Sequence, residues 1–135
     1  MRRTVRKVCA VAAGVAAAVL LAACGGKSAE EQAMAVAQQS YEALRQGNFD
    51  EFLAARAFSA ALPGGYREQL LTACRQYAHQ QQSTHGGWQK VEATRARMDS
   101  TLNLMQVFLT QRYADGTAEE IVVPMVLVEG EWRMK

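Results

Sequence analysis

The spacing of apolar residues changes at Trp88, and this change limits the folds that the chain can adopt. Before Trp88, apolar residues recur every three or four positions, which is the spacing of amphipathic helices. From Trp88 onward they alternate with polar residues between turn signals, which is typical of half-buried strands. Helices followed by consecutive strands predict an α+β fold, in which the helices cover one face of an antiparallel sheet.

The helical part divides into three predicted helices. Ser28 followed by Glu31 fits a capping box at the start of the first helix. Asn48 is the predicted N-cap of the second helix, which ends before the breaker sequence Pro63–Gly65. The third helix is predicted over residues 66–82. The helices together should form one layer over the sheet.

Four strands are predicted after Trp88, over residues 89–98, 102–113, 117–128 and 131–135. Asp115-Gly116 and Glu129-Gly130 are two-residue hairpin signals. They predict that Phe108 pairs with Val123 and that Leu127 pairs with Trp132. A first hairpin turning between Ser100 and Thr101 would pair Arg95 with Gln106. The sheet is therefore a predicted four-stranded meander, bent where Pro124 interrupts the third strand.

This register assigns each strand residue to one of two faces. The predicted helix-facing residues are Ala93, Leu104, Phe108, Ile121, Val123, Met125, Leu127, Trp132 and Met134. Arg95, Gln106 and Thr110 fall on the same concave face, where a few polar groups among apolar ones could bind a small molecule. The opposite face receives Met105, Val107, Leu109, Val122 and Val126, which predicts a surface for a protein partner.

The N-terminus has the three parts of a secretory signal. Basic residues in MRRTVRK precede an apolar run from Val8 to Leu21, which is too short to span a membrane. The tetrad Leu21-Ala22-Ala23-Cys24 resembles the bacterial lipobox; the alternative is an ordinary signal peptide with a chance cysteine. We expect a signal peptide over residues 1–23, a lipidated Cys24 with a short tether over 24–27, and a single domain over 28–135.

The lipobox resemblance implies acyl chains on the sulfur and the amine of Cys24, which anchor a protein stably because more than one chain is attached. Gly25 follows, rather than the aspartate that retains lipoproteins at the inner membrane. We therefore expect localisation in the bacterial cell envelope, at the outer membrane facing the periplasm.

Charge and cysteine content exclude two classes of protein. The sequence has 15 basic and 13 acidic residues, and removal of the signal leaves 11 basic against 13 acidic. Nucleic-acid binding needs clustered positive charge and is not expected. After processing and lipidation, Cys74 is the remaining free cysteine, so no intramolecular disulfide is expected. Its place on an apolar helical stripe indicates a small core residue.

Three stretches resemble a known family: ALRQGNFDEF in the helical part, HGGW at the entry to the first strand, and YADGTAEEIVVPMVLVEGEWRMK. They resemble the nuclear transport factor 2-like superfamily, and within it small bacterial lipoproteins of unknown function. The resemblance implies a cone-shaped domain with ligands held between the helices and the curved sheet. It also implies dimers through the sheet in some members, and an Asp–His pair in the pocket of the enzymes.

The sequence offers little for catalysis or for a metal. His79 and His85 are the two histidines, and the aspartates Asp50, Asp99 and Asp115 fall at a helix start and in turns. No His, Cys or carboxylate spacing typical of metal sites is present, and no cofactor is expected. The leading hypothesis is a non-enzymatic module that binds itself or an envelope protein through the outer sheet face. The alternative is a small-molecule binder, and an isomerase- or hydrolase-like enzyme ranks third.

Overall fold

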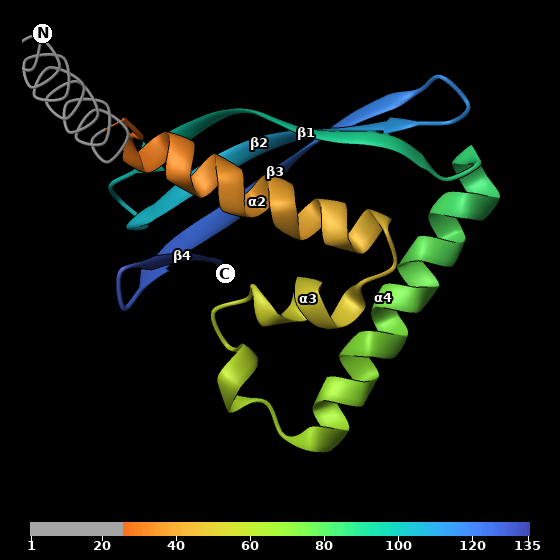
Figure 1. Ribbon diagram of the computed structural model, residues 1–135, viewed down its shortest axis with the longest axis horizontal. Coiled ribbons are helices and arrows are strands. Elements are labelled where there is room, and N and C mark those ends of the chain that lie inside the picture. The colour runs from red at the N-terminus through yellow and green to blue at the C-terminus, as the bar shows by residue number, and fades with distance from the viewer. Residues whose placement is uncertain (1–25) are drawn as a thin grey trace, which may run out of the picture.

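The computed structural model describes residues 26–135, so the predicted signal peptide and Cys24 lie outside the described residues. Four helical segments precede four strands (Figure 1). They are α2 (Ala29–Arg45), α3 (Phe49–Ala54), the 3₁₀ helix η1 (Ser59–Ala61), α4 (Gly64–His85), β1 (Trp88–Asp99), β2 (Leu104–Tyr113), β3 (Ala118–Val128) and β4 (Glu131–Met134). The predicted α+β class, with three α-helices before a four-stranded antiparallel sheet, is confirmed.

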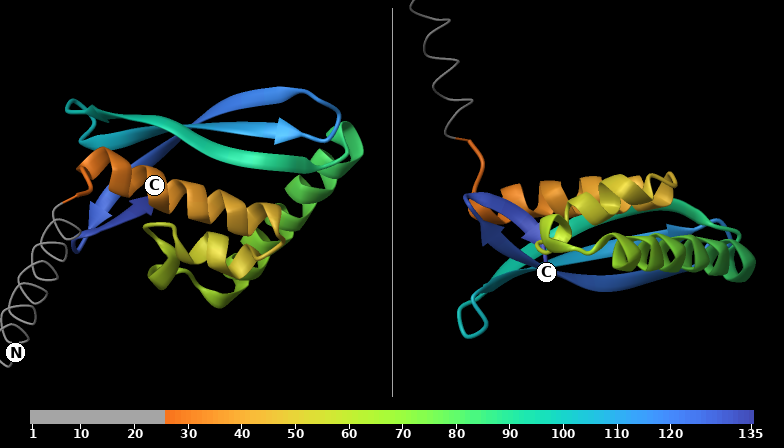
Figure 2. Two further views of the ribbon diagram at one scale, coloured as in Figure 1. Left: turned by 45° about the horizontal axis from the view of Figure 1, so that its top comes forward. Right: turned by 90° about the horizontal axis from the view of Figure 1, so that it is seen from below.

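Helix α2 covers the sheet and supplies much of the core. Its N-cap is Ser28, whose hydroxyl accepts a hydrogen bond from the Glu31 N–H at 3.2 Å, as the capping box predicts. Ala33 and Ala37 are completely buried, and their small size lets the helix approach the sheet closely. Figure 2 shows α2 lying along one face of the sheet, with α3 and α4 beyond it.

The second helix is shorter than predicted because the residues after it pair with the sheet. The backbone of residues 55–57 lies beside β4: the Met134 N–H donates to the Ala55 oxygen at 2.9 Å, and the Ala57 N–H donates to the Met134 oxygen at 2.7 Å. This short parallel bridge covers the outer edge of β4. Unpaired strand edges invite aggregation, so the bridge also protects the sheet.

The sheet has the order β1-β2-β3-β4, and every neighbouring pair is antiparallel. The predicted pairing of Leu127 with Trp132 is confirmed around the two-residue turn at Glu129-Gly130. The predicted register between β2 and β3 is wrong by one residue, since Phe108 pairs with Val122 rather than Val123.

The turn at Asp115-Gly116 explains this one-residue error. Tyr113 and Thr117 close a three-residue loop, in which Gly116 takes the left-handed conformation with φ +88°. The Asp115 carboxylate accepts from the Thr117 N–H at 2.9 Å and so favours this longer turn. A one-residue change of register moves every side chain of a strand to the other face.

The two faces of β2 are therefore opposite to the prediction. Met105, Val107 and Leu109 are completely buried in the core with residues of α2, so their assignment to an outer interface is wrong. Leu104 and Phe108 lie instead on the outer face, where Phe108 is opposite Val122. The predicted positions of Val122 and Val126 on the outer face agree with the structure.

Strand β1 also departs from the predicted register, which paired Arg95 with Gln106. Arg95 pairs with Phe108, because Asp99 pairs with Leu104 and leaves a loop of four residues where a two-residue turn was predicted. Farther from this loop, the register shifts between Trp88 and Lys90 and again between Ala93 and Arg95. The second shift turns Arg95 to the outer face.

In the part of the chain that the structure describes, no helix is long and apolar enough to cross a membrane.

Candidate ligand-binding cavity

The predicted pocket residues lie on the outer side of the sheet, away from the helices. The Arg95 guanidinium stacks on the Phe108 ring, 3.7 Å from its centroid, and lies 3.8 Å from a carboxylate oxygen of Glu120. Gln106 accepts a hydrogen bond from Arg97 at 3.0 Å. Thr110 pairs with Glu120 on the same face. The structure thus gathers Arg95, Gln106 and Thr110 on one surface, but the prediction that they line the concave side is wrong.

A cavity of about 480 Å³ lies instead among the helices. Helix α4 contributes one side through a stripe at helical spacing, α2 and α3 contribute the other, and the segment between α3 and η1 adds Arg56 and Phe58. The lining residues are Tyr41, Leu44, Phe52, Leu53, Arg56, Phe58, Tyr66, Leu70, Ala73, Cys74 and Tyr77. The volume is within the range of pockets that bind small molecules.

The walls of the cavity are mostly aromatic and aliphatic, and Arg56 is the one charged residue among its lining residues. Its guanidinium lies over the Phe58 ring, 5.0 Å from the centroid, and donates to the Lys135 backbone oxygen at 2.7 Å. These two contacts hold the cation at the cavity. A guanidinium can bind a carboxylate or phosphate through two parallel hydrogen bonds, so the cavity is suited to an anionic group.

Three tyrosines add polar groups to the walls. The Tyr41 ring packs edge-on against Phe52, with centroids 5.4 Å apart. Burial raises the pKa of the Tyr41 hydroxyl, the nearby Tyr77 raises it further, and Arg56 lowers it. Tyr41 therefore remains a neutral hydrogen-bond donor at physiological pH. Such a donor can bind a ligand oxygen without adding a charge that would compete with Arg56.

Cys74 forms part of the cavity wall and is almost completely buried. Burial raises the pKa of its thiol, while Arg56 and Arg75 oppose the shift. A nucleophilic cysteine needs the opposite, a lowered pKa that provides thiolate. The prediction that Cys74 is a small buried residue agrees with its position.

Beyond Tyr77, the junction between α4 and the sheet contains buried amides. The Tyr77 ring meets Trp88 at 5.7 Å, and the Trp88 indole N–H donates to Gln111 Oε1 at 2.6 Å. Gln111 Nε2 and Gln81 Oε1 have no hydrogen-bond partner among the described residues. Unpaired buried polar groups are destabilising, so these two atoms reduce the stability gained from packing at this junction.

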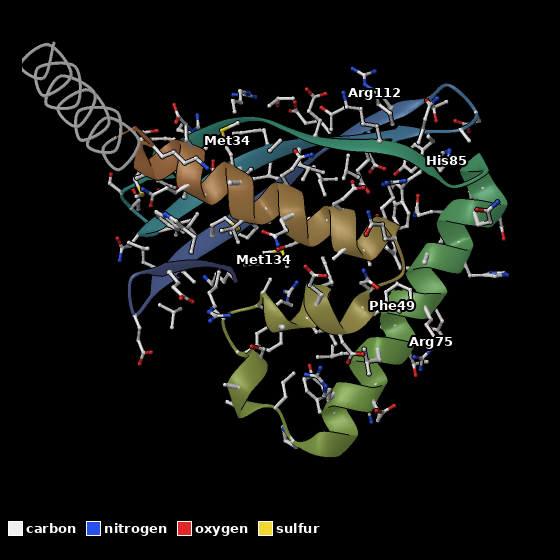
Figure 3. The ribbon with its side chains drawn as sticks, viewed as in Figure 1. Met34, Phe49, Arg75, His85, Arg112 and Met134 are labelled. Atoms are coloured by element: carbon white, nitrogen blue, oxygen red, sulfur yellow. The ribbon has the colours of Figure 1, made fainter. Side chains whose placement is uncertain are left out.

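His85 lies beside Asp115, which is 30 positions away in the sequence. Its Nδ1 is 2.9 Å from Asp115 Oδ2, and its ring stacks on Tyr113 with centroids 4.1 Å apart. Figure 3 shows His85 at the C-terminal end of α4, next to the turn between β2 and β3. Neither His85 nor Asp115 lines the cavity. The pair joins α4 to the sheet.

Comparison with known proteins supports the fold. No family model and no curated protein matches the chain. Among solved structures, it resembles a Campylobacter jejuni protein named as a candidate NTF2-like transpeptidase, with a TM-score of 0.59 and 9% identity over 73% of this chain and 93% of that one. The chain has the NTF2-like fold. At this identity the likeness concerns the fold alone.

Metal binding finds no support within residues 26–135 of this NTF2-like chain. The residues described there form no group of three or more His, Cys, Asp or Glu side chains that could hold an ion. His79 is exposed, and His85 is engaged with Asp115. The groups available to a ligand are therefore the guanidinium, the phenols and the apolar walls of the cavity.

Part of the cavity is indicated by patterns in the sequence. Tyr41, Phe52 and Tyr77 each stand at helical spacing with other apolar residues of their helices. Arg56 was not singled out, because its position depends on the bridge between residues 55–57 and β4, which no local pattern indicates. Its one sequence signal is that a basic residue stands between apolar neighbours, before Phe58 and the break at Pro63.

Proposed function

We propose that the chain is a lipid-anchored, non-enzymatic module of the bacterial cell envelope, and that its cavity binds a small amphipathic anion. The ligand would have an apolar or aromatic body and one carboxylate or phosphate. The observation that carries this proposal is Arg56, a fixed cation in a cavity otherwise lined by apolar and phenolic groups. Lipidation at Cys24 and attachment to the outer membrane remain expectations from the sequence.

The proposal does not extend the transpeptidase activity in the neighbour's name to this chain. Acyl transfer of that kind usually requires an activated nucleophile with a base beside it. Cys74 is the thiol in the cavity, and burial raises its pKa. The His85–Asp115 pair is not part of the cavity. These observations favour binding over catalysis.

Binding of an anionic dye tests the proposal. We would titrate the domain from Lys27 onward with 8-anilinonaphthalene-1-sulfonate and follow its fluorescence. In the variant Arg56→Gln we expect affinity to fall about tenfold, which is about 1.4 kcal/mol, because the ion pair is lost. The matched control is Arg67→Gln, whose arginine pairs with Asp50 on the surface.

A neutral dye separates charge recognition from apolar binding. N-phenyl-1-naphthylamine should bind the parent and the Arg56→Gln variant equally well. Equal binding of the anionic dye to the parent and to Arg56→Gln would reject the proposed role of the cation. Thermal unfolding of each variant would show whether the fold is retained.

A second role concerns the outer sheet face, which we propose as a contact for a second copy or an envelope protein. Val122 is exposed there and lies beside Phe108 and Pro124, and Val126 extends the apolar strip. Val126→Lys should weaken such an association without disturbing the core. Sedimentation of the parent and the variant over a concentration series would measure the association. If the two proteins associate equally, the association does not use this surface.

A further inference from the structure

The large apolar side chains that are exposed among residues 26–135 fall into groups with different positions. Phe58, Tyr66 and Tyr77 line the cavity, and Val122 lies on the outer sheet face. The remaining three are Met98, Leu102 and Leu127, which are 46%, 62% and 58% exposed. These three, which we call the anchor-end patch, have no role in the cavity.

The anchor-end patch lies at one end of the long axis of the domain. Met98 and Leu102 belong to the end of β1 and the turn into β2, and Leu127 comes just before the turn into β4. Both turns lie at the same end as the start of α2, in Figure 1 and in both views of Figure 2. The turn between β2 and β3 and the C-terminal end of α4 lie at the opposite end.

The proposed lipid anchor would hold this end close to a membrane. Cys24 precedes the N-cap Ser28 by four residues, and a chain of that length spans at most about 14 Å when fully extended. The start of α2 therefore could not move further than this from the acylated residue. Apolar side chains near the start of α2 would then lie within reach of the lipid headgroups.

We propose that the anchor-end patch contacts the lipid surface that holds Cys24, so that the domain is docked on the membrane by this end rather than freely tethered. The inference rests on the proposed lipid anchor. Apolar side chains gain free energy when they enter the interface between headgroups and acyl chains. The charges nearby are mixed, with Arg97 beside the acidic Asp99 and Glu129. Apolar contact rather than charge attraction must therefore hold the domain, and the docking should be insensitive to salt.

Docking by this end has a consequence for the rest of the domain. The β2–β3 turn, with the His85–Asp115 pair beside it, would project away from the lipid into the aqueous compartment. The long axis of the domain would stand away from the membrane plane, with the start of α2 nearest the lipid.

The test uses the full lipidated chain in vesicles of phosphatidylethanolamine and phosphatidylglycerol. A nitrobenzoxadiazole dye is attached at Leu102→Cys, or at the control Gln80→Cys, an exposed position near the C-terminal end of α4, at the opposite end of the domain. Both variants carry Cys74→Ala so that no other thiol of the mature chain reacts. We expect the dye at position 102 to shift to the blue and to be quenched by doxyl-labelled lipids, at low and at high salt. The dye at position 80 should show neither change.

Three other results would overturn the inference. If the chain floats with the vesicles and the dyes at 102 and 80 both report water, docking is wrong while the anchor stands. If quenching at 102 disappears at high salt, charge rather than apolar contact holds the domain. If the chain does not float and its mass shows no acyl group, the anchor fails and the docking fails with it.

Discussion

Val107 shows that a register error of one residue decides whether a side chain is assigned to the core or to the outer face. The alternating pattern of β2 contains apolar residues on both faces, so either face could cover the core. The structure buries Val107 completely and leaves Val126 on the outer face, half-buried. The two valines were predicted to share one surface, yet they differ in burial, and burial decides how much an introduced charge destabilises the fold.

Substitution of each valine by lysine tests this difference. Val107→Lys would place an unpaired charge in the core under α2, where the cost of several kcal/mol is comparable with the total stability of a small domain. We expect this variant to lose cooperative thermal unfolding. Val126→Lys should change the free energy of unfolding by less than about 1 kcal/mol. Circular dichroism melts of both variants would measure the effects, and similar melts would contradict the assignment of faces.

The hydrogen bonds of Asp115 predict that the stability of the domain falls in acid. Hydrogen bonds from the side chain and backbone of Thr117, and from His85, lower the pKa of Asp115 from its ordinary value of 3.8 to about 2. A carboxylate with a lowered pKa stabilises the folded state above its unfolded pKa, and this contribution is lost as pH falls from about 4 to about 2. The parent should therefore be more stable than Asp115→Asn at pH 6. The difference between their urea midpoints should shrink below pH 4. A difference that stays constant with pH would mean that the ionised Asp115 carboxylate is not its cause.

At the scale of elements, the helical part of the chain forms hydrogen bonds with both edge strands of the sheet. Residues 55–57 pair with β4, and on the other edge the Gln38 side chain of α2 bonds to β1. Gln38 Nε2 donates to the Val91 oxygen at 2.7 Å, and Gln38 Oε1 accepts from the Ala93 N–H at 2.5 Å. One amide thus satisfies two backbone groups beside the shift of register in β1.

Replacing Gln38 should uncover this edge. In Gln38→Leu the two backbone groups lose their partner, and we expect a loss of about 2 kcal/mol in the free energy of unfolding. The variant should also aggregate more readily, since an open strand edge can pair with another chain. Gln39→Leu is the control, because Gln39 is the exposed neighbour on α2. Urea unfolding would compare them, and equal loss in both variants would reject the role of Gln38.

The elements were predictable to the extent that local signals specify them. The capping box at Ser28 and the Glu129-Gly130 turn are short-range signals, and both predictions are confirmed. The register of β2 was wrong because a three-residue turn moved it by one residue relative to β3. The pairing of Arg95 was wrong by two residues, because the loop between β1 and β2 is longer than the predicted two-residue turn. Arg56 could not be predicted as a cavity residue, since contacts with β4 place it there.

At the scale of the whole molecule, the cavity depends on how α4 packs against α2 and α3. Ala73 is exposed on α4 and lines the cavity, so a larger side chain there would occupy space without entering the core. We expect Ala73→Phe to abolish binding of 8-anilinonaphthalene-1-sulfonate with little change in melting temperature. Thr72→Phe is the control, because Thr72 is exposed on α4 and does not line the cavity. Unchanged binding in Ala73→Phe would place the dye elsewhere.

The bridge between residue 56 and β4 also bears on the order of folding events. Each strand pairs with the strand that follows it, so the meander can form from short loops. The contact of Arg56 with Lys135 joins positions 79 residues apart, and closing so long a loop has the larger entropic cost. The hairpins should therefore form before the helical segment docks on β4. Stopped-flow measurements should show that Arg56→Gln accelerates unfolding and leaves the refolding rate nearly unchanged; a slower refolding rate would mean that the bridge forms early.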